Sequence, residues 1–310
     1  MRVLDGGSGW LDPVVISPDN KRIVATDSKG HGIRQFDLSD GTLRQAYRHG
    51  TGVVCFYPDS DQILLALEDS VLYLDWEIGL REDVSPREDY PDAIPAMQTF
   101  QMLVNPAGEL VTLGLEDNFE HYLISRWKVG KSGEFKRVSE LKLEAKNYST
   151  AALSPDCSKL MVVRETGTDR NVDTPALILT VPKFKEVGSF TISTDMPKQL
   201  LVSPTGNQIA ARGEGKSFFV WDAPGWKECR EVKLGGRRML TGLAYHPSGK
   251  RLAAACNDET VRVFDTSTWE EVSKFTWKSG RLRSVTYSAD GTLAAAGSDT
   301  GKVIVWDVDE

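Results

Sequence analysis

One pattern recurs along the chain, and this repetition constrains the fold more than any other feature. Residues 243–265 read as an apolar run, a Pro and Gly turn, a second apolar run, a polar turn, and an alternating run that ends in an aromatic residue and Asp. Residues 285–307 repeat that order almost block by block. Such copies predict antiparallel strands joined by tight turns.

The turn after the first apolar run marks each copy. It recurs at intervals of 40 to 49 residues, at Pro18, Pro58, Pro106, Pro155, Pro204, Pro247 and Ala289. A four-stranded unit of a circular array needs about 40 to 45 residues, so the longer intervals indicate loop insertions. Seven copies predict an all-β fold, a closed ring of four-stranded sheets that forms a single domain over residues 1–310.

The third strand of several copies ends in an aromatic residue followed by Asp. Trp221-Asp222 and Trp306-Asp307 carry a Trp-Asp pair, and Phe36-Asp37 and Phe264-Asp265 are variants of it. With seven aligned units, the chain resembles the WD-repeat (tryptophan-aspartate repeat) family over essentially its full length. The resemblance implies a seven-bladed β-propeller of four-stranded antiparallel blades. It also implies a non-catalytic interaction scaffold that binds a protein or peptide partner through a loop-rich top face.

The family often places a histidine about eleven residues before the repeated turn, in a hydrogen-bonded tetrad with Ser, Asp and Trp. No copy in this chain has a histidine there, and Gly236 occupies the corresponding position before Pro247. The comparison with the family therefore implies that the tetrad is missing and that only fragments remain, such as Asp258 and Asp299.

The two ends of the chain predict how the last blade is completed. Only residues 308–310 follow Trp306-Asp307, so that blade lacks an outer strand. Residues 1–5 precede the first blade without an inner partner. We expect Arg2 to Leu4 to supply the missing strand and to close the ring, because closure removes exposed sheet edges.

Three insertions account for the longer intervals. We expect residues 85–97 to connect an outer strand to the next inner strand, and residues 116–121 and 164–174 to connect second strands to third strands. Both connection types leave a propeller on the same face. Because loops on a rigid scaffold usually carry function, this face is the predicted binding site.

The charges on these connections are uneven, acidic in the insertions and basic before the last two blades. The predicted partner-binding residues are Arg237, Arg238, Trp277, Lys278, Arg281, Arg283, Glu88, Asp89, Asp117, Arg164 and Arg170. A face with an acidic side and a basic side would orient a charged partner. The alternative interpretation is that these are ordinary solvated loop charges.

No set of residues indicates catalysis or metal binding. His31, His49, His121 and His246 lie in different repeats, the 4 cysteines form no CxxC pair, and neither a P-loop nor a GxSxG motif is present. We therefore expect no catalytic residues, metal or cofactor. The alternative is a propeller enzyme resembling sugar-lactone hydrolases, which use carboxylates, His or Arg around a central channel.

Composition narrows the classes of partner. The chain has 37 Lys and Arg residues against 44 Asp and Glu residues, and the net charge of -7 argues against general binding to nucleic acid or to a membrane surface. The N-terminal segment has no apolar signal-like region, and no stretch approaches the length of a membrane span. We expect a soluble, cytoplasmic protein. Nucleic-acid binding through the arginines of the last two blades is the third alternative.

Overall fold

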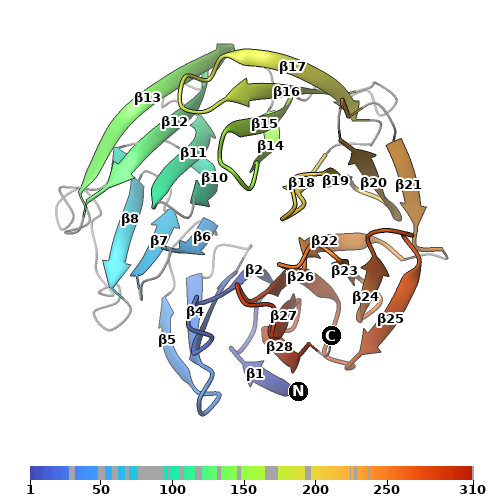
Figure 1. Ribbon diagram of the computed structural model, residues 1–310. Helices are drawn as coiled ribbons and strands as arrows, with labels where there is room; N and C mark the ends of the chain where they lie inside the picture. Colours follow the sequence, from blue (N-terminus) through green and yellow to red (C-terminus); the bar gives the residue numbers. More distant parts are fainter. Residues whose placement is uncertain are drawn as a thin grey trace. The chain divides into compact units, whose positions relative to one another are not determined.

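The described secondary structure consists of β-strands, which form seven four-stranded sheets (Figure 1). The structure is a computed structural model that describes residues 1–27, 32–47, 53–57, 62–66, 70–75, 94–95, 98–104, 108–115, 121–130, 134–144, 148–164, 174–192, 197–223, 225–226, 229–235 and 238–308. The chain divides into two compact units, residues 1–144 with 286–310, and residues 145–285.

The first unit contains three sheets whose strands pair in chain order. The first sheet consists of β2 (Leu11–Ile16), β3 (Arg22–Asp27), β4 (Gly32–Asp37) and β5 (Leu43–Tyr47). The second consists of β6 (Val53–Phe56), β7 (Gln62–Ala66), β8 (Ser70–Asp75) and β9 (Ile94–Pro95). The third consists of β10 (Gln98–Val104), β11 (Glu109–Leu115), β12 (His121–Val129) and β13 (Phe135–Glu144).

The last sheet joins the two ends of the chain. Its order is β1-β28-β27-β26, with the strands β1 (Arg2–Asp5), β26 (Leu282–Tyr287), β27 (Leu293–Ser298) and β28 (Lys302–Asp307). β1 runs antiparallel to β28, in a register that pairs Arg2 with Val305 and Asp5 with Lys302. This pairing confirms the prediction that the N-terminal strand completes the last sheet.

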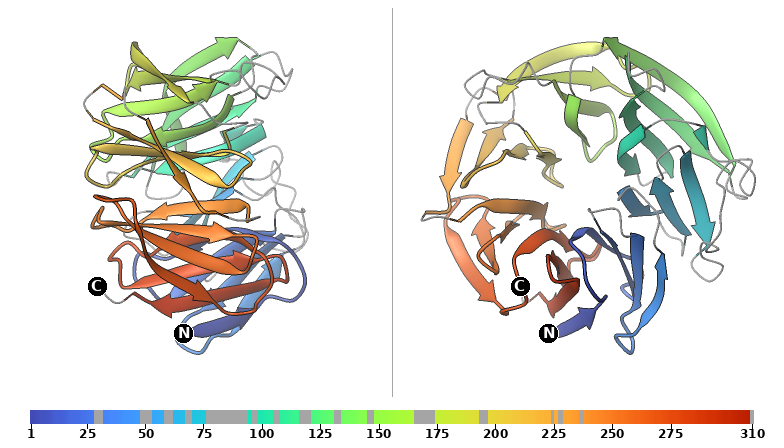
Figure 2. Two further views of the ribbon diagram at one scale, coloured as in Figure 1. Left: turned by 90° about the vertical axis from the view of Figure 1, so that its right-hand side faces the viewer. Right: turned by 180° about the vertical axis from the view of Figure 1, so that it is seen from behind.

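The second unit contains three more sheets in chain order. They are β14 (Tyr148–Leu153), β15 (Lys159–Arg164), β16 (Thr174–Thr180) and β17 (Glu186–Ile192); β18 (Gln199–Val202), β19 (Gln208–Arg212), β20 (Ser217–Asp222) and β21 (Cys229–Lys233); and β22 (Leu240–Tyr245), β23 (Arg251–Cys256), β24 (Thr260–Asp265) and β25 (Glu271–Thr276). Within this unit, the first strands β14, β18 and β22 lie side by side (Figure 2).

Six sheets are regular and one is minimal. The outer strand β9 has only 2 residues and pairs with Ser70 and Val71. The prediction that residues 85–97 connect an outer strand to the next inner strand is therefore wrong, because Ile94–Pro95 is itself the outer strand. Residues 76–93, which precede this strand, lie outside the described residues.

The core of each unit lies between neighbouring sheets. The second strand β23 carries Ala253, Ala254 and Ala255, all fully buried, and side chains this small let neighbouring sheets approach each other. Between the last two complete sheets of the second unit, the rings of Phe218 and Phe264 meet edge to face with centroids 5.3 Å apart. Such aromatic contacts add to the free energy that burial alone supplies.

The Asp that ends a third strand starts the next turn. Asp265 accepts hydrogen bonds from the backbone N–H of Ser267 at 2.9 Å and from the Ser267 hydroxyl at 2.5 Å. These bonds hold the pKa of Asp265 down at about 2. Trp269, with φ of +61°, closes the same turn by donating its N–H to Asp265 O at 2.7 Å. Trp226 has a similar φ of +52°, which agrees with a repeated structural role for the two tryptophans.

Candidate functional site

The first strands β22 and β26 approach each other closely, and this approach brings together the segments that precede them. Gly242 allows the contact: a Cβ atom at this position would lie 3.1 Å from Ser284 Cα and 3.4 Å from the Arg283 carbonyl oxygen. Gly242 and Ser284 are both the third residue of their strands. Met239 and Arg281, each one residue before its strand, therefore lie at the same level of the sheets.

Arg238 holds the segment before β22 against the hairpin turn between β23 and β24. Its Nε donates to Asp258 Oδ2, and Asp258 Oδ1 also accepts the Thr260 hydroxyl at 2.5 Å. Burial raises the pKa of Asp258, but the hydrogen bonds from Thr260 and Arg238 and the charge of Arg238 outweigh it, so the net pKa lies below the usual range. Two bonds between Met239 and Asn257 reinforce the contact: the Met239 N–H donates to Asn257 Oδ1 at 2.9 Å, and the Asn257 N–H donates to Met239 O at 3.0 Å.

A stacked aromatic pair ends the outer strand β25. The rings of Phe275 and Trp277 lie 5.7 Å apart with an angle of 3° between their planes, and both side chains are partly exposed. Beyond them, Lys278 has φ of +51° and is exposed, while the buried Ser279 donates its hydroxyl to Trp277 O at 3.2 Å. The turn thus holds a tryptophan ring next to a lysine side chain in solvent.

Four side chains define what we call the basic–aromatic surface: Met239, Trp277, Lys278 and Arg281. Met239 is 45% exposed, and Lys278 and Arg281 are exposed. Together these side chains supply apolar area and positive charge, as partner-binding surfaces do. Sequence reasoning missed Met239, although an apolar residue between Arg238 and the first strand was a usable signal.

The other predicted binding residues fall into three groups. Arg283 is half-buried within β26 and Arg238 is paired with Asp258, so neither belongs to the exposed part of the surface. Arg164 is the last residue of β15 and pairs through its backbone with Tyr148. It thus lies in the sheet formed by β14 to β17, which does not contribute to the basic–aromatic surface. The rest lie outside the described residues, namely Arg237, Glu88, Asp89, Asp117 and Arg170.

A side-chain clamp joins β18 to β22, and sequence reasoning missed it as well. Gln199 Nε2 donates to Leu243 O at 2.8 Å, and Gln199 Oε1 accepts the Leu243 N–H at 2.9 Å. Arg212 Nε donates to the same oxygen at 3.1 Å. Gln199 thus bonds to both backbone groups of Leu243, as a residue of a neighbouring strand would. These bonds hold β22, the strand that follows Met239, in place.

Comparisons with known proteins agree with the described fold. A family model described as the WD40 domain of anaphase-promoting complex subunit 4 matches residues 220–290. Nuclear distribution protein PAC1 of Gibberella zeae is 35% identical over 65 residues, which cover 21% of this chain and 14% of that protein. The β-propeller domain of Cps50 (Swd1) from Myceliophteria thermophila superposes with a TM-score of 0.71 and 13% identity, over 97% of both chains. These matches support the resemblance of the chain to the WD-repeat family.

The chain is an all-β propeller with four-stranded antiparallel blades. Meiotic fizzy-related protein 1 of Schizosaccharomyces pombe is 24% identical over 179 residues, 56% of this chain and 40% of that protein. The 66 kDa stress protein of Physarum polycephalum is 25% identical over 170 residues, 54% of this chain and 28% of that protein. The chain thus spans at most 40% of these curated relatives. The likeness to WD40 propellers suggests a protein-interaction scaffold in general, in a family that is typically non-catalytic.

Several titratable side chains of the chain take part in a turn or are buried. His246 is buried, and its Nδ1 lies 2.7 Å from the Ser248 hydroxyl and accepts the Ser248 N–H at 3.1 Å, so it caps the turn. Burial raises the pKa of Cys55 to about 12, and burial with the nearby Asp258 charge raises that of Cys256 to about 11.

Within the described ranges, no group of three or more His, Cys, Asp or Glu side chains could hold a metal ion. No helix long and apolar enough to span a bilayer occurs in these ranges either.

Proposed function

We propose that this WD-repeat protein is a non-catalytic, cytoplasmic scaffold that binds a protein or peptide partner through its basic–aromatic surface. The supporting observation is the stacked Phe275–Trp277 pair beside the exposed side chains of Lys278 and Arg281. Tryptophan and arginine are the residue types that contribute most to binding energy at interfaces. The clamped first strands below the surface limit the conformational cost of binding.

The test is a variant that removes the surface and keeps the fold. We expect Trp277→Ala combined with Lys278→Glu and Arg281→Glu to lower the recovery of co-purifying partners from the source cells at least tenfold, because an anchor and two charges are lost. Lys250→Glu is the matched control: it reverses an exposed charge at the other end of the same sheet. Equal partner recovery by the wild type and the triple variant, at equal melting temperatures, would remove this surface from the proposal.

The enzyme alternative is tested separately. Purified protein would be incubated with a panel of sugar lactones, with and without added divalent metal. The scaffold proposal predicts no hydrolysis above the buffer rate, whereas turnover that scales with protein concentration would replace it.

A further inference from the structure

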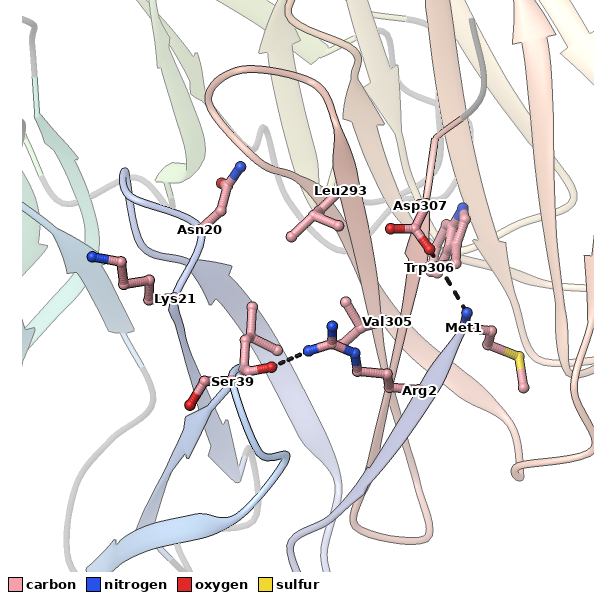
Figure 3. A pocket seen from close by; sticks show the side chains of 10 residues that line it. Met1, Arg2, Asn20, Lys21, Ser39, Leu293, Val305, Trp306 and Asp307 are labelled. Atoms are coloured by element: carbon pink, nitrogen blue, oxygen red, sulfur yellow. Dashed lines mark hydrogen bonds and ion pairs between the residues drawn. The ribbon is translucent and has the colours of Figure 1, made fainter.

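A pocket of about 250 Å³ lies in the first unit, beside the strand β1 that completes the last sheet (Figure 3). Its walls come from the turn between β2 and β3, the turn after β4, and the strands β1, β27 and β28. Sites for drug-sized ligands measure about 300 to 1,000 Å³, so this pocket is suited to one or two amino-acid side chains. It is built on connections other than those of the basic–aromatic surface.

Apolar side chains form most of the pocket wall. Leu38, Val305 and Trp306 are 4%, 3% and 7% exposed, and the partly buried Leu293 stands beside them. In Figure 3, Leu293 and Val305 point toward the same space from neighbouring strands. An apolar side chain of a ligand would gain burial against this wall.

Polar bonds hold the wall in place. Asn20 Nδ2 donates to Asp290 Oδ2 at 2.7 Å and to the Thr292 hydroxyl at 3.1 Å, so the first sheet is tied to the last. Leu38 N–H donates to Lys21 O at 2.7 Å and joins the two turns of the first sheet. A ligand therefore meets a wall that needs little ordering.

The guanidinium of Arg2 lies among these apolar side chains. Its Nη1 donates to Leu38 O, and among the described residues no carboxylate pairs with it. Asp307 is the carboxylate on the lining, and its Oδ2 lies 3.8 Å from the Met1 amino nitrogen (Figure 3). Because a guanidinium has five N–H donors in a fixed fork, donors remain for a second, bidentate acceptor.

We propose that this pocket binds a peptide carboxylate together with an adjoining apolar side chain. The carboxylate takes the remaining donors of Arg2, and the apolar side chain packs on Leu293 and Val305. A carboxylate suits the pocket better than a phosphate does, because Arg2 offers one guanidinium on a largely apolar wall. The other two cations of the lining already have carboxylate partners, Lys21 with Asp19 and the Met1 amino group with Asp307. Either a C-terminal carboxylate or an acidic side chain supplies this chemistry.

The experiment uses small probes and methyl-labelled protein. The methyl resonances of Leu38, Leu293 and Val305 would be followed by NMR during titration with N-acetyl-leucine, which mimics a C-terminus, and with acetyl-leucyl-glutamyl amide, which mimics an internal acidic residue. N-acetyl-leucinamide is the uncharged control. We expect saturable shifts of these methyl groups with at least one carboxylate probe, and affinity about tenfold lower for the amide. The probe that binds more tightly identifies the source of the carboxylate.

Two variants complete the test. Arg2→Gln should weaken carboxylate binding about tenfold, whereas Arg44→Gln, which removes an arginine paired with Asp37 and Asp40, should leave it unchanged. Equal affinity for N-acetyl-leucine and N-acetyl-leucinamide on the wild-type protein would overturn the proposal without any variant. So would the absence of shifts with both carboxylate probes. Neither result depends on the basic–aromatic surface.

Discussion

At the residue scale, three copies of the repeated turn contain a serine two residues before an aspartate. Ser17, Ser154 and Ser288 donate their hydroxyls to Asp19, Asp156 and Asp290 at 2.6, 2.5 and 2.7 Å. Each hydroxyl also accepts a backbone N–H from five residues further on, at 2.9 to 3.0 Å. The same hydroxyl therefore closes the hairpin and orients the carboxylate, and the turn does not depend on the proline itself.

Replacing Asp156 should make the stability of the protein less dependent on pH. Hydrogen bonds from Ser154 and Ser158 lower the pKa of Asp156 from 3.8 to about 2. A carboxyl with a depressed folded-state pKa stabilises the fold above its unfolded pKa, and this contribution is lost as the pH falls through the folded value. Asp156→Asn should thus destabilise the protein at pH 7, and the difference from wild type should shrink between about pH 4 and 2.

Urea denaturation across this pH range measures the effect. Glu186→Gln, at an exposed position of β17, is the control and should not change the pH dependence. A constant gap between wild type and Asp156→Asn at every pH would show that the hydrogen bonds do not act through ionisation.

At the element scale, the outer strands are the least predictable from sequence. Second strands such as β23 are buried along almost their whole length, so an apolar run identifies them. The outer strand β25 has one partner strand and is mostly exposed, with Glu271, Ser273 and Lys274 in solvent. Polar residues are tolerated there, and no hydrophobic period remains to mark the strand. For the same reason, the sequence analysis assigned β9 to the insertion at residues 85–97.

The strand β1 was predictable because the last copy of the repeat lacks an outer strand. Its buried and exposed faces allow a matched pair of variants. Leu4 is 2% exposed and packs with Val303, Val305 and Leu38, whereas Val3 is 45% exposed. Leu4→Ala should destabilise the protein by about 2 to 4 kcal/mol through lost burial and a cavity. Val3→Ala should change the free energy of unfolding by about 0.5 kcal/mol or less. Equal effects in chemical denaturation would show that β1 does not dock as described.

At the scale of the whole molecule, the contacts between sheets are the part of the fold that could not be predicted from sequence. Within a sheet, strands that are adjacent in the chain pair, so the repeat was enough to predict them. Between sheets, Gln199 reaches Leu243 from 44 residues away, and Arg238 reaches Asp258 from the segment before the strand. Arg238 was predicted to contact a partner because a charged loop residue looks the same in sequence whether or not it is paired. Trp277, Lys278 and Arg281, which were predicted in the same way, are exposed or partly exposed, and their contact with a partner stays a prediction.

The Gln199 clamp provides a test of how neighbouring sheets stabilise each other. Gln199→Ala removes both hydrogen bonds to Leu243 and a partner of Arg212, and should cost about 1 to 3 kcal/mol because partly buried polar groups lose their partners. Gln199→Glu keeps an acceptor for the Leu243 N–H and for Arg212 but loses the donor to Leu243 O, so its cost should be intermediate. Hydrogen exchange should accelerate most at the Leu243 amide in the alanine variant. Repeat proteins are stabilised largely through interfaces between neighbouring units, so the loss should extend along β22. Unchanged exchange at Leu243 would show that backbone packing around Gly242, rather than the clamp, joins these sheets.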